Sequence, residues 1–584
     1  MRRDIAMRER YINVMERALE AYSAEKLNAI ISDAETNGVR EHGFFRIVSV
    51  MGILLSNGRR AELLPLFRRG MDIACDAIWK TDMTIPENKG VGIDFAVKEI
   101  VFAYIELENS GLFPVEWLER WFDGIKSVDW RKNYSAVAHF PEERLNNWGM
   151  YNAAGEYMRE YIGAADAEEY LDIQLASQVL ALDENGMYRD PGCPMLYDLA
   201  SRAQFAVMLH FGYCGKWKET LDEALRKAGR LTLYMQSANG EIPFGGRSNR
   251  FLFNEAYLAA VCEFEASRYK KEGNTELSGQ FKAASLSALE SIERRLSQSP
   301  VKHIRNGFPQ NSSFGLEDYA YFDKYMVSLA SFIYLAYLFA DDDIRPLACL
   351  SETGGFVSRT SPDFHKITAA AGGYSAEIDT KADLHYDATG LGRIQFAGAP
   401  SELILSEPFP EKPTYSIADD SSAGMLERIR THGENPSFLS LSPVVRFEDG
   451  NETGIAELSE SVLCGLEIIE QSPEKTEFKI VWQSAETGKI SEHFLIDASG
   501  VEIRAEADIP KGAELIRYVP VIETDGSEKS DTENTEKLVT VKYRGAKLFI
   551  YGKDFEPTDK KYSNRDGIYH AFVCGGEYIK FKVE

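Results

Sequence analysis

From the start of the chain to about Ala340, apolar residues recur three and four positions apart, and Gly, Pro or Asn separate the runs. This spacing puts apolar side chains on one helix face and predicts about a dozen helices in tandem. The clearest span residues 8–22, 94–107, 148–162, 165–182, 196–211, 221–235, 251–271, 276–296 and 319–339. Because no strand pairs or fixed repeat interrupt them, they favour helix pairs closed into an (α/α)n toroid over an open α-solenoid.

After Ala340 the pattern changes to alternating polar and apolar positions with many β-branched residues. Alternation of this kind is typical of half-buried strands and predicts an antiparallel β-sandwich. Strands are expected at residues 356–359, 393–396, 401–405, 479–482, 501–505 and 578–583, and the polar run 524–535 predicts a loop. We therefore expect an α+β multidomain chain, with a catalytic toroid over residues 1–343 and a sandwich over residues 344–584.

Composition narrows the classes of partner. The chain has 584 residues, and 65 Lys and Arg against 91 Asp and Glu give it a formal charge of −26. Nucleic acids and anionic membranes would repel such a chain, so neither is an expected partner. The first residues are charged and no apolar run is long enough to span a membrane, which predicts a cytoplasmic protein. The oligomeric state stays open, a homo-oligomer included.

Two polar segments open predicted helices. The first contains Asn147, Trp148 and Glu156, and an Asn here is also a common helix N-cap. The second has a Pro- and Gly-rich loop that delivers Tyr197 to the first turn of its helix, with Arg202 further along. A buried tyrosine beside a surface ion pair of Arg202 would produce the same pattern.

Three further segments carry candidate chemistry. A loop with three glycines holds Arg247 and Arg250, whose forked donors suit a carboxylate, and it begins beside Glu241. In the second half His385 lies between acidic residues, although a lone His is more often structural. Tyrosines 319 and 321 could form a stacking wall for a sugar or pack inside a helix pair.

In chain order these segments resemble motifs of the heparinase II/III-like polysaccharide lyases, which include alginate lyases and combine an α-toroid with an antiparallel sandwich. Asn146-Asn147-Trp148-Gly149 stands where the family has Asn-Asn-His-Gly. Pro194-Met-Leu-Tyr197 is similar to the loop that places the family's catalytic tyrosine. Asp383-Leu-His385-Tyr-Asp387 is similar to the family's His-x-His-x-Asp motif, and the resemblance covers residues 146–396.

The resemblance implies β-elimination at a uronic acid. Asn147, supported by an Arg, would neutralise the substrate carboxylate and so make the neighbouring C5 proton removable. Tyr197 would act as base, acid or both. Because a tyrosine has a pKa near 10, it needs donors such as Arg202, Arg247 or His385 nearby to ionise. The O4 leaving group would take its proton from Tyr197 or His385.

Two departures keep other functions open. Trp148 and Asp383 replace family histidines, so the second motif no longer offers a histidine pair for zinc. Hydrolysis on the same scaffold would use two flanking carboxylates. The candidates for that pair are Glu156, Asp190, Glu241, Glu255, Glu317 and Asp318. A protein that binds saccharides without turnover is the third alternative.

We therefore expect a carbohydrate-active enzyme without cofactor or metal, which cleaves acidic oligosaccharides at a terminal uronate by β-elimination. The alternative enzyme is a glycoside hydrolase of the β-glucuronidase type. The expected catalytic residues are Tyr197, Asn147, His385, Glu156 and Glu241, and the expected substrate-binding residues are Trp148, Arg202, Arg247, Arg250, Tyr319 and Tyr321.

Overall fold

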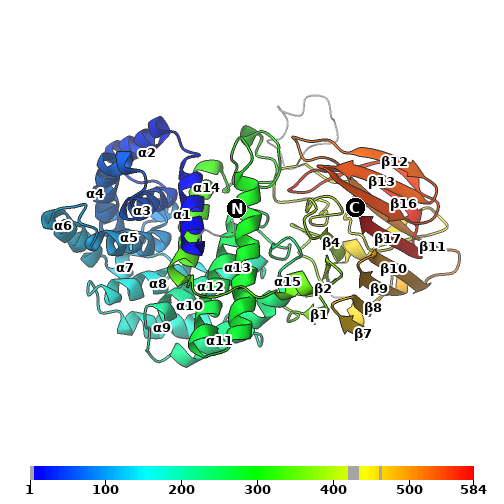
Figure 1. The fold of residues 1–584 in the computed structure, drawn as a ribbon, viewed down its shortest axis with the longest axis horizontal. Helices are drawn as coiled ribbons and strands as arrows, with labels where there is room; N and C mark the ends of the chain where they lie inside the picture. The colour runs from blue at the N-terminus through cyan, green and yellow to red at the C-terminus, as the bar shows by residue number, and fades with distance from the viewer. Residues whose placement is uncertain (1–5, 418–432, 459–462) are drawn as a thin grey trace.

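The computed structural model describes residues 6–417, 433–458 and 463–584. In these residues α-helices occupy the chain up to α15 (Leu350–Thr353), and antiparallel strands follow from β1 (Phe356–Arg359) onwards. Figure 1 shows the helical half and the sheet half side by side. The predicted order of helices followed by antiparallel sheets is confirmed.

A closed ring of helices forms the centre of the helical half. Among the described residues, six helices each pack against the next, and the last returns to the first. This inner ring consists of α3 (Gly43–Ser56), α5 (Ile93–Glu108), α8 (Trp148–Tyr161), α10 (Met195–His210), α12 (Phe253–Lys271) and α14 (Phe322–Phe339). Every residue of α3 except Ser56 is buried, as expected for a helix that is apolar on all sides. The ring confirms the predicted toroid.

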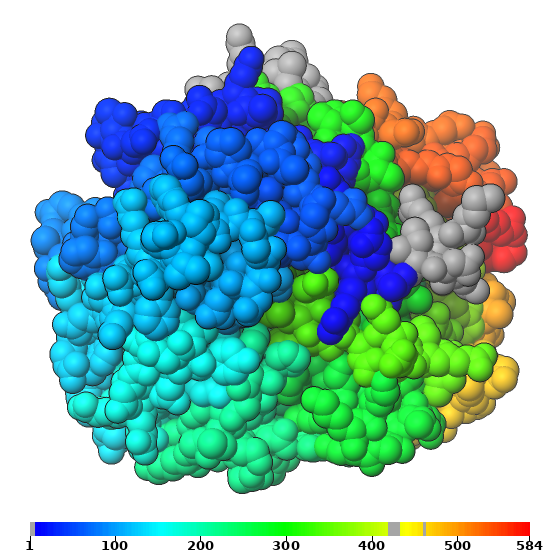
Figure 2. Space-filling model, turned by 60° about the vertical axis from the view of Figure 1, so that its left-hand side comes forward, coloured from blue at the N-terminus to red at the C-terminus, as the bar shows by residue number. Residues whose placement is uncertain are grey.

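Outer helices cover the ring and alternate with the inner ones along the chain. They are α1 (Met7–Leu19), α2 (Ala24–Asn37), α4 (Leu64–Lys80), α6 (Val115–Lys126), α7 (Trp130–Asn133), α9 (Glu168–Val179), α11 (Lys218–Met235) and α13 (Thr275–Leu296). Figure 2 shows their outer surface, with the N-terminal helices in blue to cyan above the later ones in green. In the described part of the chain, no helix combines the length and apolar character needed to cross a membrane.

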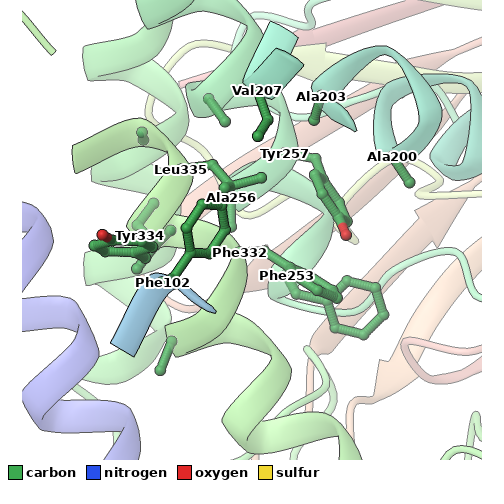
Figure 3. Close-up of a cluster of buried hydrophobic side chains, with 14 of the residues drawn as sticks. Phe102, Ala200, Ala203, Val207, Phe253, Ala256, Tyr257, Phe332, Tyr334 and Leu335 are labelled. Carbon is green, nitrogen blue, oxygen red and sulfur yellow. The ribbon is translucent and has the colours of Figure 1, made fainter. Parts of the chain in front are cut away.

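The interior of the ring is a packed core. Phe102 of α5, Val207 of α10, Ala256 of α12 and Leu335 of α14 meet there, and each is almost fully buried (Figure 3). Side chains of this kind pack at the density of an organic crystal and leave no room for water. The ring is therefore closed at this level and is not a channel.

The strands described in the second half form three antiparallel sheets with the orders β1-β2-β3-β4, β15-β16-β11-β5-β6 and β12-β13-β14-β17-β10-β9-β8-β7. Their bounds are β2 (Lys366–Ala371), β3 (Tyr374–Asp379), β4 (Gly390–Phe396), β5 (Val444–Arg446), β6 (Glu452–Gly454), β7 (Leu463–Ser472), β8 (Lys475–Ser484), β9 (Gly488–Asp497), β10 (Gly500–Asp508), β11 (Glu514–Thr524), β12 (Asp531–Thr535), β13 (Leu538–Tyr543), β14 (Ala546–Tyr551), β15 (Glu556–Ser563), β16 (Ile568–Gly575) and β17 (Tyr578–Val583). One hydrophobic core joins all three sheets, with Phe478 stacked on Phe494 at 4.7 Å.

Two predictions for this half were wrong. Residues 401–405 form turns with a single bridge to β4, because Ser401 donates to Glu241 at 2.7 Å and Glu402 pairs with Arg295 at 3.2 Å. These side chains are held in the interface with the helical half and do not follow a strand. The expected loop 524–535 contains β12, an edge strand. All residues of β12 are exposed, so its sequence lacks the alternation of a half-buried strand.

The two halves meet at a buried carboxylate. Glu241, between α11 and α12, accepts hydrogen bonds from Arg250 at 2.6 Å and from Arg305 and Ser401 at 2.7 Å. Arg393 of β4 lies 3.6 Å away. Burial favours the neutral acid, but the surrounding arginines outweigh it and hold the pKa of Glu241 well below its usual range. Glu241 thus joins loops of the helical half to the first sheet.

Replacing Glu241 by Gln keeps the shape of the side chain and removes its charge. Three buried arginines then keep a single carboxylate partner each, Asp566 for Arg250, Glu255 for Arg305 and Glu377 for Arg393. We expect the free energy of unfolding to fall by about 3–5 kcal/mol, measured by urea denaturation at neutral pH. Glu223→Gln, which breaks an exposed pair with Lys227, should cost less than about 0.5 kcal/mol. Equal effects of the two substitutions would contradict this role of Glu241.

Candidate active site

A cavity of about 360 Å³ lies where the inner-ring helices begin. Every inner-ring helix contributes a side chain from its first turns to the lining. Examples are Arg46 of α3, Phe95 of α5, Tyr151 of α8, Tyr197 of α10, Tyr257 of α12 and Lys324 of α14. The packed core of Figure 3 closes the ring below the cavity, because Phe253 and Phe332 belong to both.

The cavity is cationic although the chain is strongly acidic. The N-termini of the inner-ring helices carry partial positive charge, and they converge here with Arg46, Arg247 and Lys324. Among the described residues that line the cavity, none is an Asp or a Glu. The arrangement suits an anionic ligand.

Tyr197 lies at the centre of a hydroxyl cluster. Its hydroxyl is hydrogen-bonded to Ser248 at 3.1 Å, and Ser248 is hydrogen-bonded to Tyr319 at 3.0 Å. The Arg247 guanidinium lies 4.6 Å from the centre of the Tyr197 ring. Burial raises the pKa of Tyr197 above its usual value, and Arg247 and Ser248 offset only part of that shift. Tyr197 is therefore protonated at neutral pH and can donate a proton.

The loop that carries Arg247 and Ser248 has an unusual backbone. Gly245, Gly246 and Ser248 all have positive φ angles. Gly246 is required for space as well, because a Cβ there would lie 2.7 Å from the Cα of Pro194. Such strain persists only where the surroundings fix it, and such positions cluster at functional sites.

Asp190 is a buried carboxylate that positions two residues of the cavity. It accepts the backbone N–H of Asn147 at 2.7 Å and the Asn147 amide at 2.9 Å, and it forms an ion pair with Arg247. Asn147 and Arg247 are thereby held toward the cavity that both line. Sequence reasoning considered Asp190 only as a hydrolytic acid.

His42, directly before α3, lines the cavity and was missed. Its ring lies 4.8 Å from that of Phe95, and its Nδ1 is buried without a hydrogen-bond partner among the described residues. Burial, reinforced by the nearby charges of Arg46 and Lys324, lowers the pKa of His42 well below its usual value. The imidazole is therefore neutral at neutral pH.

Arg46 was also missed, although its position carries a signal. It is a charged residue inside the otherwise apolar helix α3. It donates to Ser328 at 2.7 Å and lies 4.7 Å from the ring centre of Phe332. Its Nε is buried and, within the described part of the chain, has no hydrogen-bond partner. A buried unpaired donor of this kind costs free energy.

The structure brings five predicted residues together around the cavity and leaves six outside it. Tyr197, Asn147, Trp148, Arg247 and Tyr319 line the cavity. Glu156, Arg202, Glu241, Arg250, Tyr321 and His385 are absent from its described lining.

The residues outside the cavity have other partners. Glu156 accepts from Tyr134 at 2.6 Å and from Arg159 at 2.7 Å, two helical turns below the start of α8. Arg202 is buried against Asp198, with 2.6 Å between the charged atoms.

Arg250 belongs to the cluster around Glu241, and Tyr321 is exposed at the start of α14. His385 is exposed on a turn in which its backbone N–H donates to Asp383 at 3.1 Å. The described residues contain no group of three or more His, Cys, Asp or Glu side chains placed to hold a metal ion.

Comparisons with known proteins give distant likenesses of fold. No protein-family model and no curated protein matches the sequence. Heparinase III has a similar structure, with a TM-score of 0.37, 8% identity, and coverage of 83% of this chain and 76% of that one. The heparan sulfate lyase HepC from Pedobacter heparinus has a TM-score of 0.33 and 12% identity, with coverage of 88% of this chain and 74% of that one. A GH127 β-L-arabinofuranosidase from Geobacillus stearothermophilus T6 has a TM-score of 0.38 and 11% identity, with coverage of 99% of this chain and 98% of that one. Similarity at this level assigns no activity to the chain.

The neutral state of His42 can be tested by NMR titration of the imidazole carbons, with His42→Gln to assign the signal. We expect a midpoint well below pH 6.5. Lys324→Met removes a neighbouring cation and should raise the midpoint, whereas Lys126→Met on the outer surface should leave it unchanged. A midpoint at or above pH 6.5 in the unsubstituted protein would contradict the described environment.

Proposed function

We propose that this chain is a carbohydrate-active enzyme that cleaves acidic oligosaccharides at a terminal uronic acid by β-elimination. The observation that carries the proposal is the composition of the cavity. Cations, helix N-termini and tyrosine hydroxyls line it, and its described lining includes no carboxylate. Hydrolysis of a glycosidic bond ordinarily uses two flanking carboxyl groups. Elimination needs charge neutralisation, a proton acceptor and a proton donor instead.

The cations of the cavity neutralise the uronate carboxylate. Arg46 of α3 and Lys324 of the neighbouring helix α14 both line the cavity. The Asn147 amide gives one N–H to Asp190 and keeps its second for a ligand. Donors to the carboxylate stabilise the negative charge that develops when the C5 proton leaves, which makes that proton removable.

Tyr197 donates the proton that O4 requires. Its raised pKa keeps it protonated, and its contact with Ser248 orients the hydroxyl. His385 was the other predicted donor, but it lies on an exposed turn outside the described lining. Tyr197 is therefore the proton donor in the proposed reaction.

His42 accepts the C5 proton. Its imidazole lines the cavity and is neutral. As the proton passes to His42, the electrons of the C5–H bond form the C4–C5 double bond. The C4–O4 bond then breaks with its electron pair on O4, which takes the proton of Tyr197. Exchange with water returns both side chains to their starting states.

The shape of the cavity supports action at a chain end. Its floor is the packed core of Figure 3, so a saccharide that enters from the mouth cannot pass through the ring. Trp148 and Tyr319 add aromatic faces on which a sugar ring can stack. A terminal residue fits such a closed site better than the middle of a polymer. Because elimination breaks the C4–O4 bond, this terminal uronate is the reducing-end residue, and its O4 carries the saccharide that leaves.

Tyr197→Phe removes the proton donor and keeps the ring. We expect kcat on uronic acid oligosaccharides to fall by about 10²–10⁴-fold, followed by near-ultraviolet absorbance of the C4–C5 double bond together with product mass. Tyr321→Phe is the matched change outside the cavity and should leave kcat unchanged. Products one water heavier, without new absorbance, would establish hydrolysis and refute the proposal.

His42→Gln removes the proton acceptor and should lower kcat by about 10²–10⁴-fold, with little change in KM. In the unsubstituted enzyme, activity is present above the pKa of His42 and is lost as the pH falls through it. Because that pKa is well below 6.5, the acidic limb of the kcat profile should lie there too. His385→Gln is the control and should leave the profile unchanged. A fully active His42→Gln variant would exclude His42 as the acceptor.

A further inference from the structure

A second cavity of about 790 Å³ adjoins the first. Trp148 lines both cavities, and Asn146 lines the second where its neighbour Asn147 lines the first. The second cavity is bounded by the loops that precede α8 and α10 and by Asp363, which follows β1. It therefore lies between the mouth of the ring and the sheet half.

The charge of the second cavity is positive after its ion pairs are counted. Arg189 pairs with Asp363 at 3.1 Å. Asp190 pairs with Arg247, which lines the first cavity. Lys89 and Arg144 are exposed, and neither forms an ion pair with any described residue. These two cations remain without a counter-charge in a chain of net charge −26.

We propose that the second cavity is a binding site for an anionic sugar residue adjacent to the uronate in the first cavity. Arg144 and Lys89 would contact its carboxylate or sulfate group, as Arg and Lys commonly do. Trp148 separates the two sugar residues. The proposal rests on the proposed function, because it takes the first cavity as the site of the terminal uronate.

This site narrows the substrate class. A uronate linked to a neutral sugar fills the first cavity and leaves the cations of the second without a partner. A uronate linked to a second acidic sugar satisfies both sets of cations. The preferred substrates are therefore oligosaccharides with negative charge on consecutive residues, which the enzyme distinguishes from singly charged glycosides by affinity.

Calorimetric binding to Tyr197→Phe protein, in which turnover is suppressed, tests the site. The probes are a disaccharide of two uronic acids, a uronate linked to a sulfated hexose, and a uronate linked to a neutral hexose. Adding Lys89→Gln and Arg144→Gln should weaken binding of at least one doubly charged probe roughly tenfold and leave the neutral-hexose probe unchanged. The probe that loses affinity identifies the anionic group. Arg120→Gln with Lys216→Gln removes the same charge from the outer surface and should change none of the affinities.

Equal effects of the cavity pair on all three probes, no effect on either doubly charged probe, or no binding of any probe would overturn the proposal. The proposed function is judged separately by the product of the unsubstituted enzyme. Hydrolytic products with a charge-dependent affinity would retain the second site and reject elimination. Unsaturated products with unchanged affinities would support elimination and reject the second site.

Discussion

In a ring of paired helices all inner helices point in the same direction, because an outer helix returns the chain to the starting rim before the next inner helix begins. In this chain the alternation runs from α3 to α14, and it gathers the N-termini of the inner ring at one rim. The partial positive charges of those N-termini therefore converge at the place where the cavity forms. The positive potential of the cavity therefore begins with the helix arrangement. The charges of Arg46, Arg247 and Lys324 add to it.

The sheet half fixes the loops at that rim. Ser248 donates its backbone N–H to Glu317 at 2.7 Å, and Glu317 is held by Arg565 from the turn between β15 and β16. The Glu241 cluster holds the same loop from the other side through Arg250. Ser248, in contact with Tyr197, thus owes its position to strands far away in sequence. This explains how a loop with several positive φ angles keeps one conformation.

The sequence could predict elements whose pattern is local. Helix α14 is a nearly continuous apolar run, and Tyr197 follows a Pro- and Gly-rich loop that marks a helix start. Partners distant in sequence were beyond such reasoning. Glu241 and Arg250 looked like ligands for a substrate because nothing local reveals that they pair with each other and with β4. Apart from Arg46 and Phe95, the residues that line the cavity lie more than a hundred positions from His42, and no motif surrounds it.

The buried cluster at Glu241 also bears on how this architecture can be exchanged between chains. Its arginines come from two inter-helix segments and from β4, and all are almost fully buried. A helical ring transplanted without the sheets would lose Arg393 from this cluster and Asp566, the second carboxylate partner of Arg250. The smallest transferable module is therefore the ring together with the sheet half, since Arg565 and Asp566 lie in the turn between β15 and β16. Recombination at the boundary between helices and strands would therefore separate residues that together hold the loops of the cavity in place.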